Sequence, residues 1–126
     1  MKLDRITDGE LSILQILWER GEATSREITG ALHDEVTDPK MASVQKLIER
    51  LEGKGCVERD RSERAHRFRP LVSHDRFLRS RLQSLADRLC DGALVPLVTT
   101  LLRTERLPKK EREELRKLVD DLWPSK

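Results

Sequence analysis

The sequence predicts a mainly α-helical fold with one small β-hairpin, followed by a second region that is wholly helical. Two amphipathic segments between Thr24 and Glu52 are separated by a short polar break, and a basic hairpin then extends to Pro70. The rest of the chain carries leucine stripes and no further strand pattern. Two helices joined in this way are typical of a helix-turn-helix, and the hairpin is what a winged helix adds. We therefore expect a winged helix-turn-helix at residues 1–72 and a helical dimerisation region at residues 73–126.

The first expected helix opens with a capping box, in which the Thr7 hydroxyl and the Glu10 carboxylate each bind an otherwise unpaired backbone N–H. Gly21 stands where helices commonly end. The apolar side chains between them recur on one face of the helix, which predicts that this face is buried. They are Leu11, Leu14, Leu17 and Trp18.

A second capping box, Thr24 with Glu27, predicts the start of the next helix. We expect Glu22–Ala23 to form a short bridging strand before it. The inward-facing residues of this helix are predicted to be Ile28, Ala31 and Leu32. Residues 37–39 are expected to form a turn, because Pro39 disfavours helical backbone at Asp38.

The third helix is expected from about Lys40 to Glu52, with glycines 53 and 55 after its end. Its apolar side chains are spaced i, i+3, i+4 and i+7, which predicts one buried face. That face comprises Val44, Leu47, Ile48 and Leu51, and the opposite face carries Ser43, Gln45, Lys46, Glu49 and Arg50.

The hairpin is predicted from two short alternating segments, Cys56–Asp60 and Ala65–Arg69, around a polar tip at residues 61–64. Ala65, Arg67 and Arg69 are expected on one side of the second strand, with His66 and Phe68 on the other. A strand histidine without a spaced cysteine or carboxylate partner is more often a packing residue than a metal ligand. Cys56 and Cys90 are interpreted as small buried apolar groups.

After Pro70, Ser73 is the expected N-cap of a long fourth helix whose leucines are spaced 4, 3 and 4 residues apart, as in a heptad seam. Leu94–Leu102 is almost entirely apolar, and a last helix is expected from about Pro108. No sheet is expected in this region to bury these leucine stripes. We therefore predict that a second copy of the chain covers them. The predicted dimerisation residues are Leu78, Leu82, Leu85, Leu89, Leu101, Leu115, Leu118 and Leu122.

The charge distribution points to a nucleic-acid ligand. Residues 1–39 carry a net charge of −5 and residues 71–126 a net charge of +3, while residues 40–70 hold nine basic and five acidic residues. A localised basic face is the usual electrostatic signature of phosphate binding. The predicted DNA-binding residues are Lys40, Met41, Ala42, Ser43, Gln45, Lys46 and Arg50 of the third helix and Arg61, Arg64 and Arg67 of the hairpin. Because the N-terminal part of a recognition helix usually reaches the base edges, Met41, Ala42, Ser43 and Lys46 are favoured over Arg50 for base contact.

Composition argues against several other classes of protein. Aromatic residues make up 3% of the chain, too few for the stacking platforms on which RNA and single-strand binding depend. The sequence has no apolar run near the roughly 20 residues of a membrane span, and no Gly-rich phosphate loop or zinc-ligand spacing. We therefore expect a cytoplasmic protein that is not an enzyme, with no cofactor and no metal. The alternative left open is a winged-helix protein-interaction module without sequence-specific DNA binding.

Taken in order, these segments make the chain resemble the penicillinase-repressor family of bacterial winged-helix regulators (BlaI/MecI/CopY type). The resemblance is carried by residues 6–10, the Leu14-x-x-Leu17-Trp18 pattern, residues 24–28, residues 43–51, Lys54-Gly55 and residues 67–70. It implies a homodimeric repressor that binds a pseudo-palindromic operator, in a resistance or stress-response regulon, with dimerisation through the C-terminal helices.

The resemblance also implies a membrane sensor-protease as a partner, whose cleavage position aligns with Thr100–Leu101. The pair that the family cleaves there is Asn-Phe, which this sequence lacks. The paired Cys-x-Cys motifs of the copper-responsive branch are missing from residues 106–126, which argues against a copper sensor. Glu63 stands where the family usually has glycine, and this predicts a reshaped or longer hairpin tip.

Overall fold

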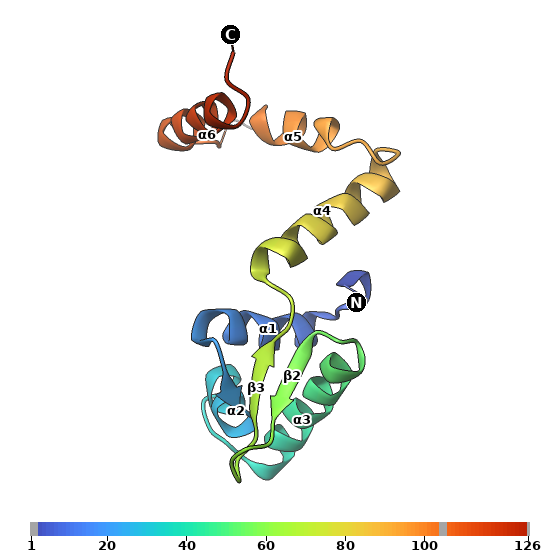
Figure 1. The fold of residues 1–126 in the computed structure, drawn as a ribbon, viewed down its shortest axis with the longest axis vertical. Helices are drawn as coiled ribbons and strands as arrows, with labels where there is room; N and C mark the ends of the chain where they lie inside the picture. The colour runs from blue at the N-terminus through green and yellow to red at the C-terminus, as the bar shows by residue number, and fades with distance from the viewer. Residues whose placement is uncertain (1–2, 104–105, 126) are drawn as a thin grey trace. The chain divides into compact units, whose positions relative to one another are not determined.

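The chain folds as two units that divide after Ser84, inside helix α4 (His74–Leu89). The computed structural model describes residues 3–103 and 106–125 (Figure 1). Before α4 the first unit contains, in order, the 3-10 turn η1 (Leu3–Arg5), α1 (Asp8–Arg20), β1 (Ala23–Thr24), α2 (Ser25–Leu32), α3 (Asp38–Gly53), β2 (Val57–Asp60) and β3 (Arg67–Pro70). The second unit contains α5 (Val95–Leu102) and α6 (Lys109–Leu122).

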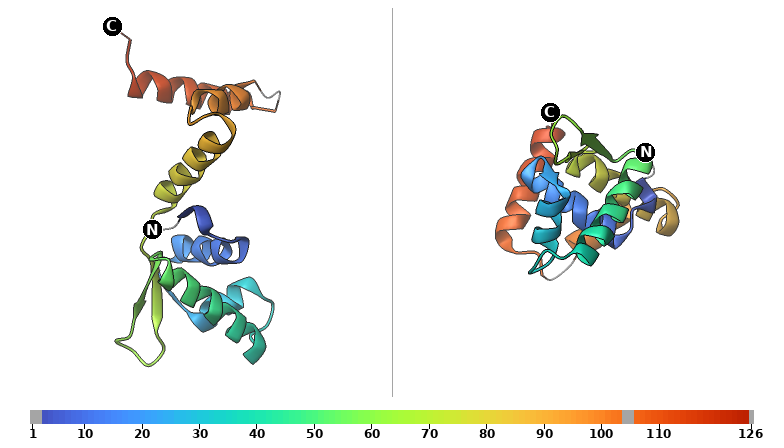
Figure 2. Two further views of the ribbon diagram at one scale, coloured as in Figure 1. Left: turned by 90° about the vertical axis from the view of Figure 1, so that its right-hand side faces the viewer. Right: turned by 90° about the horizontal axis from the view of Figure 1, so that it is seen from below.

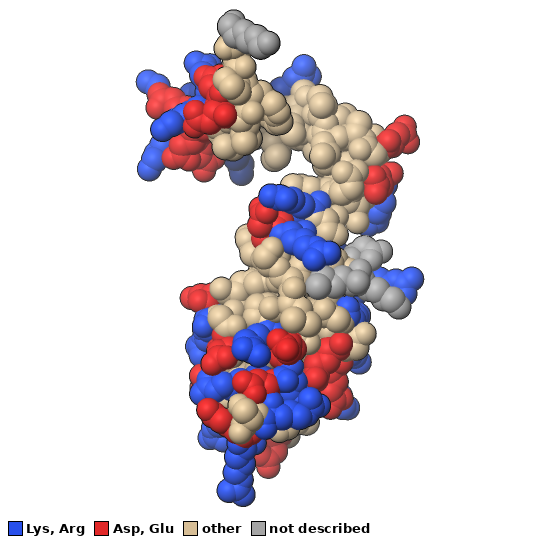
Figure 3. Space-filling view, in the orientation of Figure 1, with Lys and Arg blue, Asp and Glu red and all other residues tan. Residues whose placement is uncertain are grey.

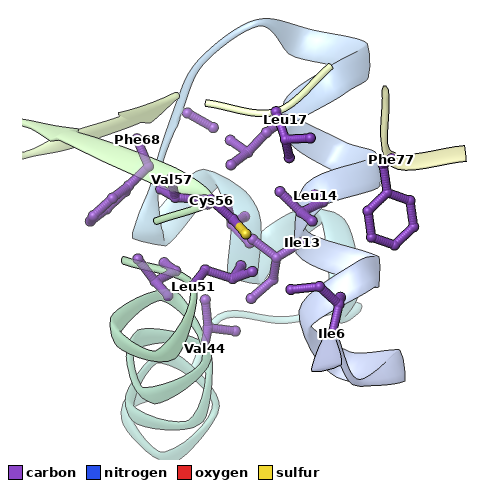
Figure 4. Packing of buried hydrophobic residues seen from close by; sticks show 14 of the residues in the cluster. Ile6, Ile13, Leu14, Leu17, Val44, Leu51, Cys56, Val57, Phe68 and Phe77 are labelled. Carbon is purple, nitrogen blue, oxygen red and sulfur yellow. The ribbon is translucent and has the colours of Figure 1, made fainter. Parts of the chain in front are cut away.

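The first unit is a winged helix-turn-helix. Its three-stranded antiparallel sheet has the order β1-β3-β2, with Phe68 of β3 opposite both Ala23 and Arg59. Three helices pack on this sheet (Figures 1 and 2). Figure 4 shows the core between them, where side chains of α1, α3 and the strands face one another. The predicted fold class, mainly α with a small β-hairpin, is confirmed.

Both predicted capping boxes are present. The Thr7 backbone N–H donates to Glu10 Oε1 at 3.1 Å, and the Glu10 N–H donates to Thr7 Oγ1 at 3.3 Å. Thr24 and Glu27 exchange the equivalent pair of bonds, each 3.1 Å long. Gly21 ends α1 with a φ of 87°, a backbone conformation that glycine adopts without strain.

The expected turn at residues 37–39 is wrong, because α3 already begins at Asp38. The Thr37 hydroxyl accepts a hydrogen bond from the Lys40 N–H at 3.4 Å and so caps the helix. Pro39 lies in the first turn, where a backbone N–H would have no helical partner in any case, so proline breaks no bond there.

Strand boundaries also differ from the prediction. The bridging strand is Ala23–Thr24, one residue later than expected, and β3 begins at Arg67 rather than at Ala65. The longer connection is stabilised by the Asp60 carboxylate, which accepts a hydrogen bond from the Ser62 N–H at 2.9 Å. Ala31 of α2 is exposed, and Thr29 is buried instead, with its hydroxyl donating to the Ser25 carbonyl at 2.7 Å.

The first part of α4 packs on α1. Ser73 caps the helix as predicted, since its hydroxyl accepts from the Arg76 N–H at 3.1 Å. Trp18 Nε1 donates to the Val72 carbonyl at 2.8 Å, its ring lies 5.4 Å from that of Phe77, and Arg81 donates to the Ile6 carbonyl at 2.6 Å. These contacts explain why the first unit extends past residue 72, the end that we expect for the winged helix, to Ser84.

The second unit leaves its apolar side chains accessible. Neither α5 nor α6 has a buried residue. Leu101 is 64% exposed and Leu118 is 51% exposed, although both lie on apolar stripes. Within the described ranges, none of the helices combines the length and the apolarity that crossing a membrane requires.

Candidate nucleic-acid interface

Helix α3 presents a polar outer face because its inner face is fixed in the core. Val44, Ile48 and Leu51 are fully or almost fully buried. The opposite side chains are therefore directed to solvent. Of the predicted contact residues, Ala42, Ser43, Gln45, Lys46 and Arg50 are exposed, while Lys40 and Met41 are half-buried.

The wing is the loop between β2 and β3, residues 61–66, and its tip carries two exposed arginines, Arg61 and Arg64. The hydrogen bond from the Ser62 backbone holds the pKa of Asp60 below its ordinary value, so this carboxylate is charged where it starts the loop. Glu63 does not take up a left-handed conformation; among the described non-glycine residues only Asp91 has a positive φ. The wing tip therefore does not require the glycine that the family usually has.

The basic residues of the interface segment fall into two groups. Lys40, Lys54, Arg59, Arg67 and Arg69 each have a carboxylate within 4.0 Å. In the part of the chain that the structure describes, no carboxylate lies within that distance of Lys46, Arg50, Arg61 or Arg64. Within residues 40–70, the cations without an ion-pair partner among the described residues thus lie on the outer face of α3 and at the wing tip.

Arg67, in contrast, is surrounded by carboxylates. Glu22, Glu27 and Glu63 each lie 3.8 Å from its guanidinium group. The pKa of Glu27 is held below its ordinary value by its hydrogen bonds with Thr24 and then by Arg67, so this neighbour is charged. Arg67 has internal partners that compete with phosphate, which makes it a weaker candidate for DNA contact than Arg61 or Arg64.

Several exposed cations outside residues 40–70 were not selected from the sequence, and Arg26 is one of them. Arg26 lies in the first turn of α2, beside Glu27, and it has no carboxylate partner among the described residues. It belongs to the acidic N-terminal segment, so the charge distribution along the sequence gave no signal for it. Figure 3 shows basic side chains projecting at the hairpin end of the first unit, with acidic ones interspersed over its surface.

The end of α3 is attached to the start of α1 by a buried ion pair. Lys54 Nζ donates to Glu10 Oε1 and to the Arg5 carbonyl, both at 2.7 Å, and Glu10 is completely buried. Burial alone would raise the pKa of Glu10, but hydrogen bonds from Lys54 and Thr7 outweigh it and hold the pKa below its ordinary value. This pair fixes one end of the candidate recognition helix.

The remaining predicted site residues lie on the exposed stripes of the C-terminal helices. Leu78, Leu82 and Leu85 are 41–46% exposed and Leu89 is 71% exposed. An open groove of about 390 Å³ is lined mainly by apolar side chains of α5 and α6. Thr100 and Leu101 lie inside α5, where the Thr100 hydroxyl donates to the Pro96 carbonyl at 2.8 Å.

The structure offers little for a metal or a reactive thiol. Among the described residues, no three His, Cys, Asp or Glu side chains come together as a metal site. Cys56 is buried, and burial raises the pKa of its thiol. His66 of the wing is half-buried, and its Nδ1 lies 3.1 Å from Nη1 of Arg59.

Comparison with known proteins places these features in a family context. A model of the penicillinase repressor family matches residues 6–121. The chain is 23% identical to the penicillinase repressor of Bacillus licheniformis over 95% of its own length and 93% of that protein. It is 26% identical to the penicillinase repressor of Staphylococcus aureus, covering 93% of this chain and 92% of the relative. A solution structure of the DNA-binding domain of the repressor BlaI covers 58% of this chain and 88% of that one, with 23% identity and a TM-score of 0.48.

Proposed function

Because this chain belongs to the penicillinase repressor family, we propose that it is a transcriptional repressor that binds double-stranded DNA as a homodimer on a pseudo-palindromic operator. The observation that carries the proposal is the position of the cations of residues 40–70 that have no ion-pair partner among the described residues. They occupy the face of α3 that a helix-turn-helix presents to the major groove and the tip of the wing that follows it. The relatives are named as repressors, which supports the prediction that the chain is not an enzyme.

The two parts of this interface have different roles in the proposal. The N-terminal part of α3, with Met41, Ala42, Ser43 and Lys46, reaches base edges in the major groove, and Gln45 lies beside them. Arg50, Arg61 and Arg64 contact phosphates, which supplies affinity and register but little sequence information. Arg26 is added to the phosphate contacts because it is exposed and has no ion-pair partner among the described residues.

Dimerisation through the C-terminal helices is supported by their exposed apolar side chains. A helix without a buried face gains little from packing within its own chain, whereas a second copy with the same stripes can cover it. Repression is proposed to be steric, with the dimer occupying a promoter in the cytoplasm. A membrane sensor-protease remains the proposed partner for induction, at Thr100–Leu101.

The experiment that tests this function is selection of bound sequences from a pool of random-sequence duplexes, followed by footprinting on the enriched sequence. We expect two half-sites with two-fold symmetry, about one helical turn apart or slightly more. Recovery of no preferred sequence, together with binding that is equal on all duplexes, would favour the protein-interaction module.

A further inference from the structure

Arg59 of β2 connects the wing to the recognition helix. Its Nε donates to Glu52 Oε2 at 3.1 Å and its Nη2 donates to Glu52 Oε1 at 2.7 Å. Glu52 lies in the last turn of α3. Two parallel N–H···O bonds between a guanidinium and a carboxylate form the most strongly oriented ion pair that side chains make.

The same guanidinium also holds the other arm of the hairpin. Its carbon lies 4.7 Å from the centre of the Phe68 ring, and Nη1 lies 3.1 Å from His66 Nδ1. A guanidinium can only donate, so His66 Nδ1 must accept this bond. Arg59 and His66 stand on opposite sides of the tip that carries Arg61 and Arg64, and Arg59 therefore fixes both arms of the wing to α3.

The Arg59–Glu52 ion pair is shorter than the other ion pairs that the arginines of the hairpin make. Arg67 and Arg69 approach their carboxylates at 3.8 Å and 3.5 Å, whereas the shortest Arg59–Glu52 distance is 2.7 Å. The Arg59 and Glu52 side chains are only 22% and 25% exposed. The hydrogen bond from Arg59 lowers the pKa of Glu52, so the carboxylate is ionised at neutral pH and the pair is a charged one.

We infer that Arg59 and Glu52 are positioning residues for DNA binding, which hold the wing at a fixed place beside the recognition helix so that both contact one duplex. The inference rests on the proposed function. Arg59 itself is occupied by Glu52 and His66, so it acts through Arg61 and Arg64 at the tip. A wing fixed in advance loses less conformational freedom when it meets the phosphates, and its contacts contribute more to affinity.

Substitution of Glu52 gives the sharper test, because the two explanations of its role predict opposite changes in DNA affinity. A carboxylate near a DNA-binding face repels phosphate, so its removal should strengthen binding if its role is only electrostatic. If Glu52 positions the wing, Glu52→Ala weakens binding instead. Glu49→Ala is the matched control, since Glu49 is an exposed carboxylate of the same helix without an ion-pair partner among the described residues.

The assay is affinity of the full chain for mixed-sequence duplex DNA at several salt concentrations. Glu52→Ala should lower the salt slope by about one to two units for each bound protomer, because Arg61 and Arg64 each release nearly one counterion. Glu49→Ala should keep the slope and bind equally or more tightly. Glu52→Gln keeps the shape of the side chain but loses the charge and one of the two acceptor oxygens for Arg59, so it should also lower the slope. A melting curve of each variant shows that the compared chains are folded.

The outcomes separate the two proposals. If the unchanged chain shows no salt-dependent binding to duplex DNA, the proposed function itself fails. If the unchanged chain binds but Glu52→Ala behaves like Glu49→Ala, the positioning role is refuted while the proposed function stands. If Glu52→Ala does not fold, Glu52→Gln decides, and a folded Glu52→Gln variant that behaves like Glu49→Ala refutes the inference.

Discussion

Replacing Lys54 by methionine is predicted to destabilise the first unit strongly. Lys54 donates two hydrogen bonds of 2.7 Å, and one of them neutralises a carboxylate that is completely buried. Without Lys54, Glu10 Oε1 keeps only its bond from Thr7, and Oε2 has no hydrogen-bond partner among the described residues. Removing one member of a buried ion pair costs about 3–5 kcal/mol. Because the Lys54 side chain is 21% exposed, we expect about 3 kcal/mol, at the lower end of that range.

This prediction is checked by thermal unfolding at a fixed protein concentration. For a unit of this size, a loss of about 3 kcal/mol should lower the Tm by more than about 10 °C. The control is the double variant Glu10→Gln with Lys54→Met. Glutamine still accepts from the Thr7 N–H but carries no charge, so this variant should recover most of the lost stability. Equal Tm values for Lys54→Met and the unchanged chain would refute the argument from buried charge.

The pH dependence gives a second check with a definite sign. In the unchanged chain the pKa of Glu10 is lowered, so its contribution to stability is present above the ordinary value of 4.5 and is lost as the pH falls through the folded-state pKa. In Lys54→Met burial is no longer outweighed by Lys54, so the buried carboxylate is easier to protonate. The stability difference between the two chains should therefore shrink as the pH is lowered from neutral toward that ordinary value.

Four further predictions concern DNA binding, assembly and local structure. Lys46→Ala should weaken operator binding by about 1–3 kcal/mol if it contacts a base. Arg64→Ala should weaken operator and scrambled duplex alike and lower the salt slope by about one unit; unchanged operator affinity in both variants would argue against this DNA face. Replacing Leu82 and Leu85 by aspartate should reduce the sedimenting mass from about twice 14.6 kDa to the single-chain value, whereas a chain that sediments as a monomer before substitution contradicts the dimer. Thr37→Ala should cost about 1 kcal/mol by removing the cap of α3, and an unchanged Tm would show that the cap contributes nothing.

The elements that the sequence predicted correctly depend on local interactions. Each capping box joins residues three positions apart, and the buried stripe of α3 follows from helical periodicity alone. The same local reasoning misplaced the start of α3. Proline disfavours helical backbone at the residue before it, and this effect led to the prediction of a turn. Proline is nevertheless tolerated in the first turn of a helix, and this second effect decides the structure. The Thr37 hydroxyl was the signal that would have corrected it.

The pairing of the basic residues could not be predicted in the same way. The sequence shows nine cations in residues 40–70 but not which of them meet carboxylates. Lys54 meets Glu10 across 44 positions, and Arg67 meets Glu22 and Glu27 only because β1 pairs with β3. The sequence therefore predicted the segment that forms the candidate interface. The structure shows which of its cations pair with carboxylates and which have no such partner among the described residues.

Because α5 and α6 have no buried side chains, the proposed dimer would link their folding to the amount of protein present. Packing supplied by another copy would stabilise these helices by mass action, so their apparent free energy of folding would change by about 1.4 kcal/mol for each tenfold change in concentration above the Kd of the dimer. Such a chain would lose the ordered structure of α5 and α6 on dilution, while the first unit, with its own core, stays folded. Its occupancy of paired half-sites would then fall more steeply than its abundance.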